Sequence, residues 1–586
     1  MSSEKIENKT CQNCKNDFTI DSDDFSFYEK IKVPPPTWCP ECRMIRRMMW
    51  INERALYKRN CDLCKKSFIS IYPSDSPYVV YCSGCWKSDQ WDCFSYGQDY
   101  DFSRSFFEQF KELQLKVPRQ GLIHIAEPII NSDFANYVSE VKNAYLSYSA
   151  IRGSEDIYYS KNTDNSKKIF DSLDIVQSES CFECVNGVKN YSCAFSYFSE
   201  NCIESSFLFN CKNCSNCFGC VGLRNKQYFI WNEQYTKEEY IKEIGKINYS
   251  SYKNLQEIKQ KFDEYILQFP RHYMNSVNYI NSTGFGVKNS KDCKMVFEVY
   301  DCENVSYGFR CPGIKDSMDV VSAGWAELMY EFSSGGGVGS QNVKFIANGL
   351  QSQMDCEYTD SCGFSSSNLF GCIGVKSGQY SILNKKYLRE EYENLVLKIK
   401  EHMNTMPYID AKGRVFKYGE FFPYDICPFA YNETIAQEHF STTKERALSM
   451  GYEWKDASKR DYTLEIATED LPDDINQADE SVVGKVIECG HKGICNEQCT
   501  EVFKIISEEF LLYKKMGFPL PRLCPNCRHY ERLKKKNPLK LWHRQCMCDK
   551  KHSHHEGKCE IEFETSYAPD RKDIVYCNKC YQQEVY

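Results

Sequence analysis

The sequence lacks the features that mark most membrane proteins and most enzymes. No window approaches the run of about 18 apolar residues that a membrane-spanning helix needs. The common phosphate-binding, dinucleotide-binding, zinc-protease and serine-hydrolase motifs are all missing. Only 10 histidines occur in 586 residues, several of them in one tract near the C-terminus, so no acid–base pair is evident. These absences leave an unrecognised enzyme as a minor alternative and predict neither membrane attachment nor a small-molecule substrate.

The N-terminal segment also lacks the apolar stretch of a signal peptide, because its first ten residues are polar. Without export, the chain is expected in the reducing cytoplasm, where cysteines serve as thiols or metal ligands rather than as disulfides. The formal net charge of −8 argues against a chain covered with nucleic acid but leaves room for a local basic patch.

What the sequence has in abundance is cysteine, with 34 residues, and many of these form one module that occurs twice. Cys14 is separated from Cys39 by the same number of residues as Cys499 is from Cys524. In both copies the second pair begins with the same Cys-Pro dipeptide and is followed directly by arginine. Two cysteine pairs separated by a short hydrophobic segment are typical of a tetrahedral zinc site.

A second cysteine set follows the first in each copy. Near the N-terminus it is Cys61, Cys64, Cys82 and Cys85, and near the C-terminus the matching set is interrupted by an insertion between Cys546 and Cys559. This insertion brings further soft donors, so that one of them could replace Cys546 as a ligand. These alternative donors are Cys548, His552, His554 and His555.

We therefore predict about four structural Zn²⁺ ions, each held by four thiolates. A closed shell of four cysteines has no open position for water or substrate, so these ions are expected to stabilise the fold and do no chemistry. Small ribbons build little core of their own, and metal binding supplies their folding energy. The predicted ligands are Cys11, Cys14, Cys39, Cys42, Cys61, Cys64, Cys82, Cys85, Cys495, Cys499, Cys524, Cys527, Cys546, Cys559, Cys577 and Cys580.

Each copy of the module also carries a basic segment beside its cysteines. Matched cationic segments in an acidic chain favour contact with phosphates, and RNA is the first candidate partner. The alternative is that these charges form a solvated helix face that complements the anionic thiolates. The candidate nucleic-acid contacts are Arg43, Arg46, Arg47, Arg59, Arg528, Arg532, Lys534, Lys535 and Arg544.

The middle of the chain has a different regularity, a cysteine at every ninth residue. One series is Cys184, Cys193, Cys202, Cys211 and Cys220, and a second is Cys293, Cys302 and Cys311. A short fixed period is typical of a solenoid. Nine residues are too few to close a coil, so we expect two units, or about 18 residues, to form one β-coil.

The second series continues with valine, methionine and alanine in place of cysteine, which favours the interpretation of these cysteines as small packing residues. The dense run Cys211, Cys214, Cys217 and Cys220 keeps a metal site in the solenoid open as the alternative. The solenoid is also doubled, because residues 218–240 resemble residues 370–392 and each copy leads into an amphipathic helix, at about 237–268 and 389–403.

The predicted fold is mainly β with some α: treble-clef-like zinc ribbons at both ends flank a two-part β-solenoid with capping helices. Its predicted domains are a tandem zinc-ribbon module (1–100), a helical connector (101–140), two solenoid halves (141–270 and 271–405), a mixed connector with an acidic linker (406–484) and a second zinc-ribbon module (485–586). A single helix is expected over 101–117 and another near 442–450.

The order of motifs resembles a group of cysteine-rich proteins from candidate-phyla (Patescibacteria) bacteria. The resemblance rests on the cysteine pairs and arginines at Cys11–Cys61, on the PLPRxCPNCRH segment and on the FETSYAPDRxxxVYCxxCY segment. It implies zinc binding through the cysteines and no assigned activity. Some members carry a CaiB/BaiF CoA-transferase label, which no motif here supports. The function expected from the sequence is a non-catalytic zinc-binding scaffold with RNA as first partner, or a scaffold whose solenoid binds another protein.

Overall fold

A computed structural model describes residues 6–322, 324–334, 338–456 and 462–585. Their contacts divide the chain into two compact units. Unit 1 comprises residues 1–125, 274–455 and 564–566, and unit 2 comprises residues 126–273, 456–563 and 567–586. Each unit therefore combines one cysteine module with one half of the solenoid: the N-terminal module joins the second half, and the C-terminal module joins the first half.

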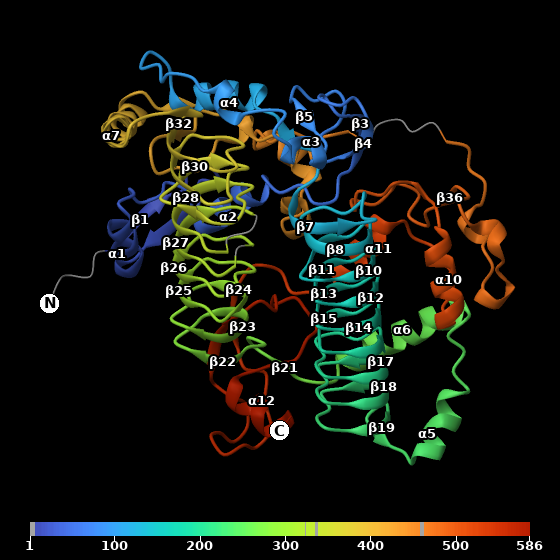
Figure 1. The fold of residues 1–586 in the computed structure, drawn as a ribbon. Helices are drawn as coiled ribbons and strands as arrows, with labels where there is room; N and C mark the ends of the chain where they lie inside the picture. Colours follow the sequence, from blue (N-terminus) through green and yellow to red (C-terminus); the bar gives the residue numbers. More distant parts are fainter. Residues whose placement is uncertain (1–5, 323, 335–337, 457–461, 586) are drawn as a thin grey trace. The chain divides into compact units, whose positions relative to one another are not determined.

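The first half of the solenoid is a column of stacked parallel strands (Figure 1). The coils between residues 138 and 188 contribute one strand to each of two sheets, and the other coils contribute strands to the larger sheet alone. The strands of the larger sheet are β7 (His124–Ile130), β8 (Val138–Tyr145), β10 (Glu155–Tyr158), β12 (Lys167–Phe170), β14 (Glu179–Phe182), β16 (Tyr191–Ala194), β17 (Ile203–Phe209), β18 (Ser215–Val221), β19 (Gln227–Ile230) and β20 (Glu233–Gln234). Those of the smaller sheet are β9 (Tyr148–Ile151), β11 (Lys161–Asp164), β13 (Leu173–Val176) and β15 (Val185–Val188).

One coil takes 12 residues, not the 18 expected from the cysteine spacing. Glu155 pairs with Lys167, and Lys167 pairs in turn with Glu179. From Asp156 to Asn216 every third residue has a left-handed backbone, with φ between 43° and 59°. The chain therefore bends after every three residues, and four bends complete a coil.

Many of these bends carry asparagine or aspartate, the non-glycine residues that adopt a left-handed backbone most readily. Their side chains also bond from coil to coil: Asn201 donates to Asn213 across 3.1 Å, and Asn213 donates to Asn225 across 2.9 Å. These ladders offset part of the conformational cost of the bends.

The inward-facing residues also recur at every third position, and small side chains fill the narrow interior. Cys184, Cys193, Cys202, Cys211 and Cys220 are all at most 1% exposed. Their thiols donate to backbone carbonyls of the same coil, as from Cys184 Sγ to the carbonyl oxygen of Cys193 at 3.4 Å. Any step that is a multiple of three leads to another inward position, which explains why a nine-residue spacing occurs in a 12-residue coil.

A larger side chain at such an inward position should not fit. We expect Cys193→Leu to lower the stability of unit 2 by about 1–3 kcal/mol, because added methylene groups in a packed interior force the backbone apart. Lys167→Leu, at a position whose side chain is 58% exposed on the same column, is the matched control and should change stability little. Denaturant unfolding of the two variants would contradict this account of the interior if both were equally stable.

The second half of the solenoid, in unit 1, follows the same pattern (Figure 1). Glu303 pairs with Lys315, and Lys315 pairs with Glu327, again at an interval of 12 residues. Its strands are β22 (Val277–Ile280), β23 (Gly284–Lys291), β24 (Val296–Tyr300), β25 (Glu303–Ser306), β26 (Lys315–Met318), β27 (Glu327–Phe332), β28 (Gln341–Ala347), β29 (Gln353–Met354), β30 (Glu357–Asp360), β31 (Ser366–Phe370), β32 (Gln379–Ile382) and β33 (Lys385–Lys386).

Helices follow the last coil of each half. Helix α7 (Arg389–Thr405) agrees with the sequence prediction and contacts β32. The other predicted helix, 237–268, is divided into α5 (Lys237–Ile244) and α6 (Tyr252–Ile266). Gly245 ends α5, and the Ser251 hydroxyl accepts from the backbone N–H of Asn254 to begin α6. The predicted capping box of Thr236 and Glu239 is present at the start of α5.

The remaining elements belong to the modules and connectors. In unit 1 they are β1 (Glu7–Thr10), β2 (Asp17–Ile20), α1 (Ser22–Ile31), α2 (Pro40–Met48), β3 (Tyr57–Asn60), β4 (Ser67–Ser70), β5 (Val80–Tyr81), α3 (Ser83–Lys87), α4 (Phe106–Lys116), β6 (Arg119–Gln120), β34 (Tyr408–Ile409), β35 (Val415–Phe416), α8 (Ile435–His439) and α9 (Lys444–Ser449). In unit 2 they are β21 (Arg271–His272), β36 (Ile487–Glu488), β37 (Val502–Phe503), α10 (Ser507–Met516), α11 (Pro525–Leu533), β38 (Trp542–Gln545), β40 (Val575–Tyr576) and α12 (Asn578–Val585), and β39 (Glu562–Thr565) begins in unit 2 and ends in a segment assigned to unit 1.

Candidate metal centres and the arginine networks beside them

Each module builds its first cysteine cluster from a hairpin and the start of a helix. In the N-terminal module, Cys11 follows strand β1, and the chain turns back through Lys15, whose φ is 65°, into β2. Cys39 is the N-cap of α2, and Cys42 lies in its first turn behind Pro40. The helix N-terminus and the hairpin turn together present four sulfur atoms to one point, which is the treble-clef arrangement expected from the sequence.

The spacing of the sulfur atoms suits one tetrahedral ion. Zinc–sulfur bonds of about 2.3 Å place the ligands of a tetrahedron about 3.8 Å apart. Cys14 Sγ lies 3.7 Å from Cys39 Sγ, and Cys64 Sγ lies 3.9 Å from Cys82 Sγ. In each of four clusters all sulfur atoms lie within 4.8 Å of one another, and these clusters are Cys11, Cys14, Cys39 and Cys42; Cys61, Cys64, Cys82 and Cys85; Cys489, Cys499, Cys524 and Cys527; and Cys546, Cys559, Cys577 and Cys580.

The third cluster differs from the prediction, because Cys489 takes the place assigned to Cys495. A backbone N–H donates to the first sulfur of every cluster: Cys39 to Cys11, Cys82 to Cys61, Cys524 to Cys489 and Cys577 to Cys546, at 3.2–3.3 Å. Cys489 thus occupies the position of Cys11. Cys495 remains close, with its Sγ 3.7 Å from Cys527 Sγ.

Cys495 and Cys499 have the short spacing expected of the first two ligands, so the sequence favours Cys495 over Cys489. In this cluster a longer loop joins β36 to β37, and Cys489 directly follows β36 as Cys11 follows β1. Strand β36 is only the dipeptide Ile487–Glu488, so no sequence pattern singles out Cys489 and its role follows from the pairing of β36 with β37.

Replacing the two cysteines separately distinguishes their roles. Cys489→Ser should remove about one metal ion per chain, whereas Cys495→Ser should leave the metal content unchanged, because only Cys489 receives the N–H bond that every first ligand receives. Metal analysis of the purified variants gives the answer. The reverse result would restore Cys495 as the ligand.

The electrostatics of a cluster suit a cation. Hydrogen bonds from the Cys39 and Cys42 thiols lower the pKa of Cys11, and hydrogen bonding within the same cluster raises the pKa of Cys42. Hydrogen bonds from neighbouring thiols thus stabilise one thiolate, and the neighbouring thiol of Cys42 becomes harder to ionise. Four thiolates at these distances need a positive charge between them, and a soft divalent ion that accepts tetrahedral sulfur ligands fits this donor set.

The arginines directly after the ligands in helix α2 are buried against the solenoid. Arg43 Nε contacts Asp319 Oδ2 at 2.6 Å, and Arg47 Nη2 contacts Asp319 Oδ1 at 3.4 Å. Arg46 contacts Glu331 at 2.7 Å and Glu420 at 3.0 Å. The three arginines are at most 1% exposed, and burial lowers the pKa of Arg47.

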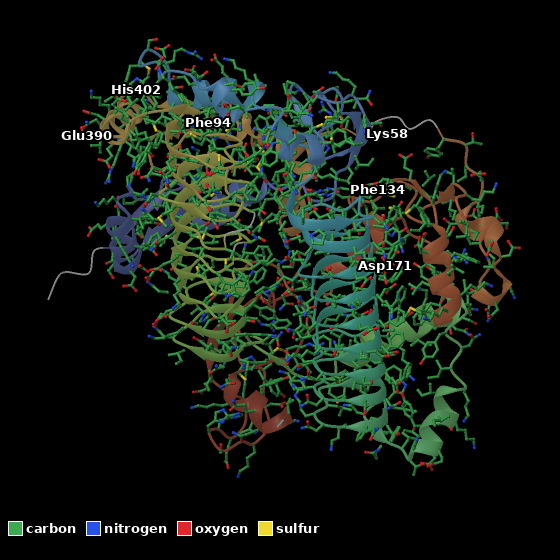
Figure 2. All side chains as sticks on the ribbon, in the orientation of Figure 1. Lys58, Phe94, Phe134, Asp171, Glu390 and His402 are labelled. Atoms are coloured by element: carbon green, nitrogen blue, oxygen red, sulfur yellow. The ribbon has the colours of Figure 1, made fainter. Side chains whose placement is uncertain are left out.

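Unit 2 contains the same arrangement with its own residues. Arg528 Nη1 lies 2.5 Å from Asp171 Oδ2, and Arg532 Nη1 lies 2.9 Å from Asp171 Oδ1. Asp171, labelled in Figure 2, lies on the coils of the first solenoid half. Burial raises the pKa of Glu509 in helix α10, which contacts Arg528 at 3.1 Å.

The correspondence extends to the surrounding residues. Tyr307 lies one coil before Asp319 and donates to Asp24, and Tyr159 lies one coil before Asp171 and donates to Glu509. We call these sets network 1 (Asp24, Arg43, Arg47, Tyr307 and Asp319) and network 2 (Glu509, Arg528, Arg532, Tyr159 and Asp171). Each network fixes a metal-binding helix to a bend of the solenoid.

The prediction that these arginines contact nucleic acid is therefore not supported by where they lie. Arg43, Arg46, Arg47, Arg528 and Arg532 are at most 7% exposed and are bonded to carboxylates. The sequence of a helix that combines metal ligands with arginines is basic. Here its positive charge compensates carboxylates of the same unit.

The other candidate contacts also have partners within their unit. Arg59 donates to the carbonyl of Pro73, and Arg544 donates to those of Tyr567 and Ala568, so both close a ribbon loop. Lys534 pairs with Glu497 and Glu531, and Lys535 pairs with Asp263. Of the predicted set, only Lys534 is mostly exposed, with 57% of its side chain accessible.

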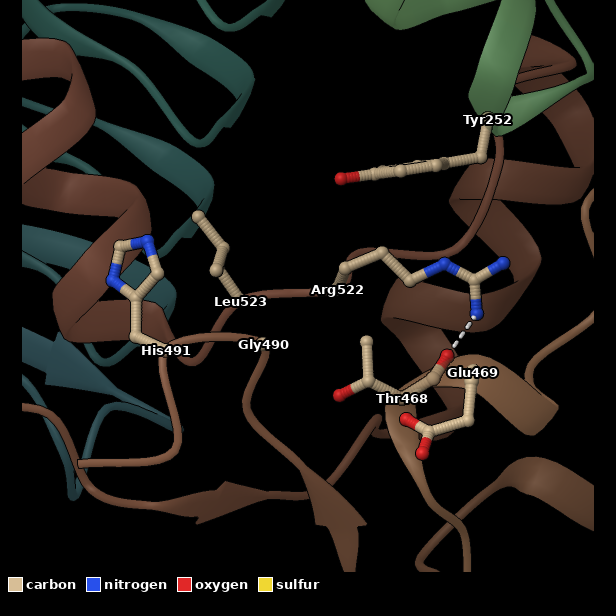
Figure 3. Close-up of a pocket in the computed structure, with 7 residues that line it drawn as sticks. All are labelled: Tyr252, Thr468, Glu469, Gly490, His491, Arg522 and Leu523. Atoms are coloured by element: carbon tan, nitrogen blue, oxygen red, sulfur yellow. Dashed lines mark hydrogen bonds between the residues drawn. The ribbon is translucent and has the colours of Figure 1, made fainter. Parts of the chain in front are cut away.

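A hollow of about 470 Å³ opens beside the third cluster (Figure 3). It is lined by Tyr252, Thr468, Glu469, Gly490, His491, Arg522 and Leu523. Arg522 donates to the backbone carbonyls of Thr468, Leu471 and Pro472, and His491 Nδ1 lies 3.2 Å from Glu497. Arg522 and His491 thus already have partners in the wall of the hollow. The residues that line it do not pair a nucleophile with a neighbouring base.

Comparisons with known proteins give no indication of function, so any functional proposal rests on the geometry of the sites. The sequence matches no protein-family model, and no curated protein is a significant match. The resemblance to the candidate-phyla proteins therefore remains an expectation. Among the described residues, no helix has the length and apolar character needed to cross a bilayer.

Proposed function

We propose that this protein is a non-catalytic scaffold in which zinc ions hold two cysteine modules against two solenoid halves, and that exposed solenoid faces bind another protein. The observation that carries the proposal is the pair of arginine networks. In both units the helix that supplies metal ligands also supplies the arginines that bind the solenoid. Metal binding and module docking thus depend on the same two helices.

Zinc is the metal that the donor sets favour. Four thiolates with tetrahedral spacing are typical of structural zinc sites, and soft thiolates discriminate against magnesium and calcium. Because each shell is closed by protein sulfur, the ion has no free position on which to activate water. Its role in this proposal is to supply the folding energy of modules that have little core of their own.

The first solenoid half offers a surface for a partner along one line of paired positions. Tyr191 and Ile203 are register partners on neighbouring strands and are 49% and 46% exposed. Lys142, Glu155 and Lys167 continue the same line as a ladder of ion pairs. An exposed apolar pair beside a charged ladder has the character of a protein-binding face, and solenoids commonly bind along such extended faces.

A nuclease-treated pull-down with the full-length chain tests this proposal. The chain should retain a stoichiometric protein, and Tyr191→Glu with Ile203→Glu should reduce that retention at least about tenfold by placing charge in the apolar pair. Leu397→Glu is the control, because Leu397 is 67% exposed on helix α7. Failure to retain any protein, together with recovery of nucleic acid from an untreated lysate and binding that falls steeply as salt rises, would overturn the proposal in favour of an RNA scaffold.

A further inference from the structure

The insertion that interrupts the last cysteine set forms a second group of metal donors. In the N-terminal module only two residues separate Cys61 from Cys64, whereas the corresponding Cys546 and Cys559 are separated by a longer segment. Cys548, His552 and His555 come from this segment, and together with Cys580 they place four ligand atoms within 4.8 Å of one another. Cys580 also belongs to the fourth cluster.

A tight backbone turn brings the two histidines together. His552 N–H donates to the carbonyl of His555 at 3.0 Å, and their ring centroids lie 5.2 Å apart. His552 Nε2 lies 3.1 Å from Cys548 Sγ, and His555 Nε2 lies 3.1 Å from Cys580 Sγ. A tetrahedral zinc ion with one nitrogen and one sulfur ligand would hold such a pair at about 3.6 Å, so loading requires only a small opening.

The tautomer of His555 suits metal binding. Its Nδ1 lies 2.8 Å from the carbonyl oxygen of Gly557. Since a carbonyl oxygen only accepts, Nδ1 carries the proton and Nε2 keeps its lone pair. A second nitrogen bonded to a backbone carbonyl is the usual support of a metal-binding histidine.

Charge gives a further reason for a second ion. Cys546, Cys548, Cys559, Cys577 and Cys580 are at most 2% exposed. As thiolates around one divalent ion they would carry a net charge of −3, and a second divalent ion would reduce this to −1. Burying uncompensated charge is costly, so a fifth thiol this close to the cluster favours either a proton or another cation.

We propose that the C-terminal module binds two metal ions, one held by Cys546, Cys559, Cys577 and Cys580 and the other by Cys548, His552, His555 and Cys580, with the Cys580 thiolate bridging them. Seven side chains then complete two tetrahedral shells. Both shells are closed, so the pair is structural and ties the inserted turn to helix α12. The inserted segment that supplies three of its ligands has no counterpart between Cys61 and Cys64. The proposal does not depend on what the solenoid binds.

Metal counting on the full-length chain tests the second ion. The wild-type chain should hold one zinc ion more than a variant with His552→Ala and His555→Ala. His543→Ala is the control, because His543 is 63% exposed in the same module and belongs to neither shell. Equal metal content in the wild type and the double variant would overturn the proposal. Because the comparison is a difference, it does not depend on the other clusters being filled.

Two further measurements separate the bridge from its alternatives. After exchange with ¹¹³Cd, the wild-type chain should show one pair of cadmium resonances coupled through the shared sulfur. One ion of the pair has four sulfur ligands, and the other has two sulfur and two nitrogen ligands. Absence of a coupled pair would overturn the bridge.

His554 Nε2 also lies 3.4 Å from Cys580 Sγ. Loss of the ion in His554→Ala but not in His555→Ala would contradict the assignment of His555.

Discussion

Stripping the metal from the full-length chain with an excess of chelator should unfold both cysteine modules while the solenoid coils stay folded. Structural zinc supplies about 10–16 kcal/mol of apparent binding free energy in small metal-binding domains, which is comparable to the whole stability of a typical domain. Helices α2 and α11 should lose amide protection, because their first turns are fixed by Cys39, Cys42, Cys524 and Cys527. The bonds between solenoid coils need no metal.

Hydrogen exchange followed by mass spectrometry measures this effect segment by segment. Peptides from β1–α2 and β36–α11 should exchange at least about a hundredfold faster after chelation, and added Zn²⁺ should restore their protection. Peptides from β10–β18 act as the internal control and should change much less. Full protection of the modules in a metal-free chain would show that the cysteines do not hold them together.

Asp171→Asn should destabilise unit 2 by about 3–5 kcal/mol, the second largest effect that we expect. Asp171 accepts from both Arg528 and Arg532, and its loss of charge leaves two buried guanidinium groups without their main counter-ion. Asp319→Asn should have an effect of the same size in unit 1, because Asp319 forms ion pairs with both Arg43 and Arg47. The free energy of local opening, from hydrogen exchange in each unit, is the quantity to compare.

Asp316→Asn provides the matched control for these two variants. Asp316 also lies at a left-handed bend, with φ 44°, but its ion pair with Lys30 is solvent-accessible, at 32% and 51% exposure. Exposed ion pairs contribute less than about 1 kcal/mol. An effect of Asp171→Asn no larger than that of Asp316→Asn would mean that the networks do not hold the modules on the solenoid.

The sequence allowed a cysteine cluster to be predicted where its spacing was short, or where the match between the two modules bridged an insertion, as for Cys546 and Cys559. A hairpin turn that places Cys61 and Cys64 on one ion needs just two intervening residues, and this local geometry is visible in the spacing. Cys489 was not predicted because its loop is long and Cys495, which lies closer to Cys499, offers a spacing nearer to that of Cys11 and Cys14. The insertion after Cys546 offers several donors in the sequence, but only the folded turn places the rings of His552 and His555 5.2 Å apart.

The arginine networks could not be predicted in the same way. Arg43 and Asp319 are separated by 276 positions, and Arg528 and Asp171 by 357. A basic helix has the same sequence whether it faces phosphates or carboxylates, so only the packing distinguishes the two. The coil length could not be predicted either, because inward positions recur every three residues. A cysteine spacing of nine residues is therefore compatible with a coil of 12.

The central claim is that metal ions held by cysteine organise both ends of the chain. Native mass spectrometry of the full-length protein, purified without chelator, tests it most directly, because the mass lost on denaturation gives the number and identity of the bound ions. We predict at least about four zinc ions per chain, one for each four-cysteine cluster. A folded chain with one ion or none would contradict the account.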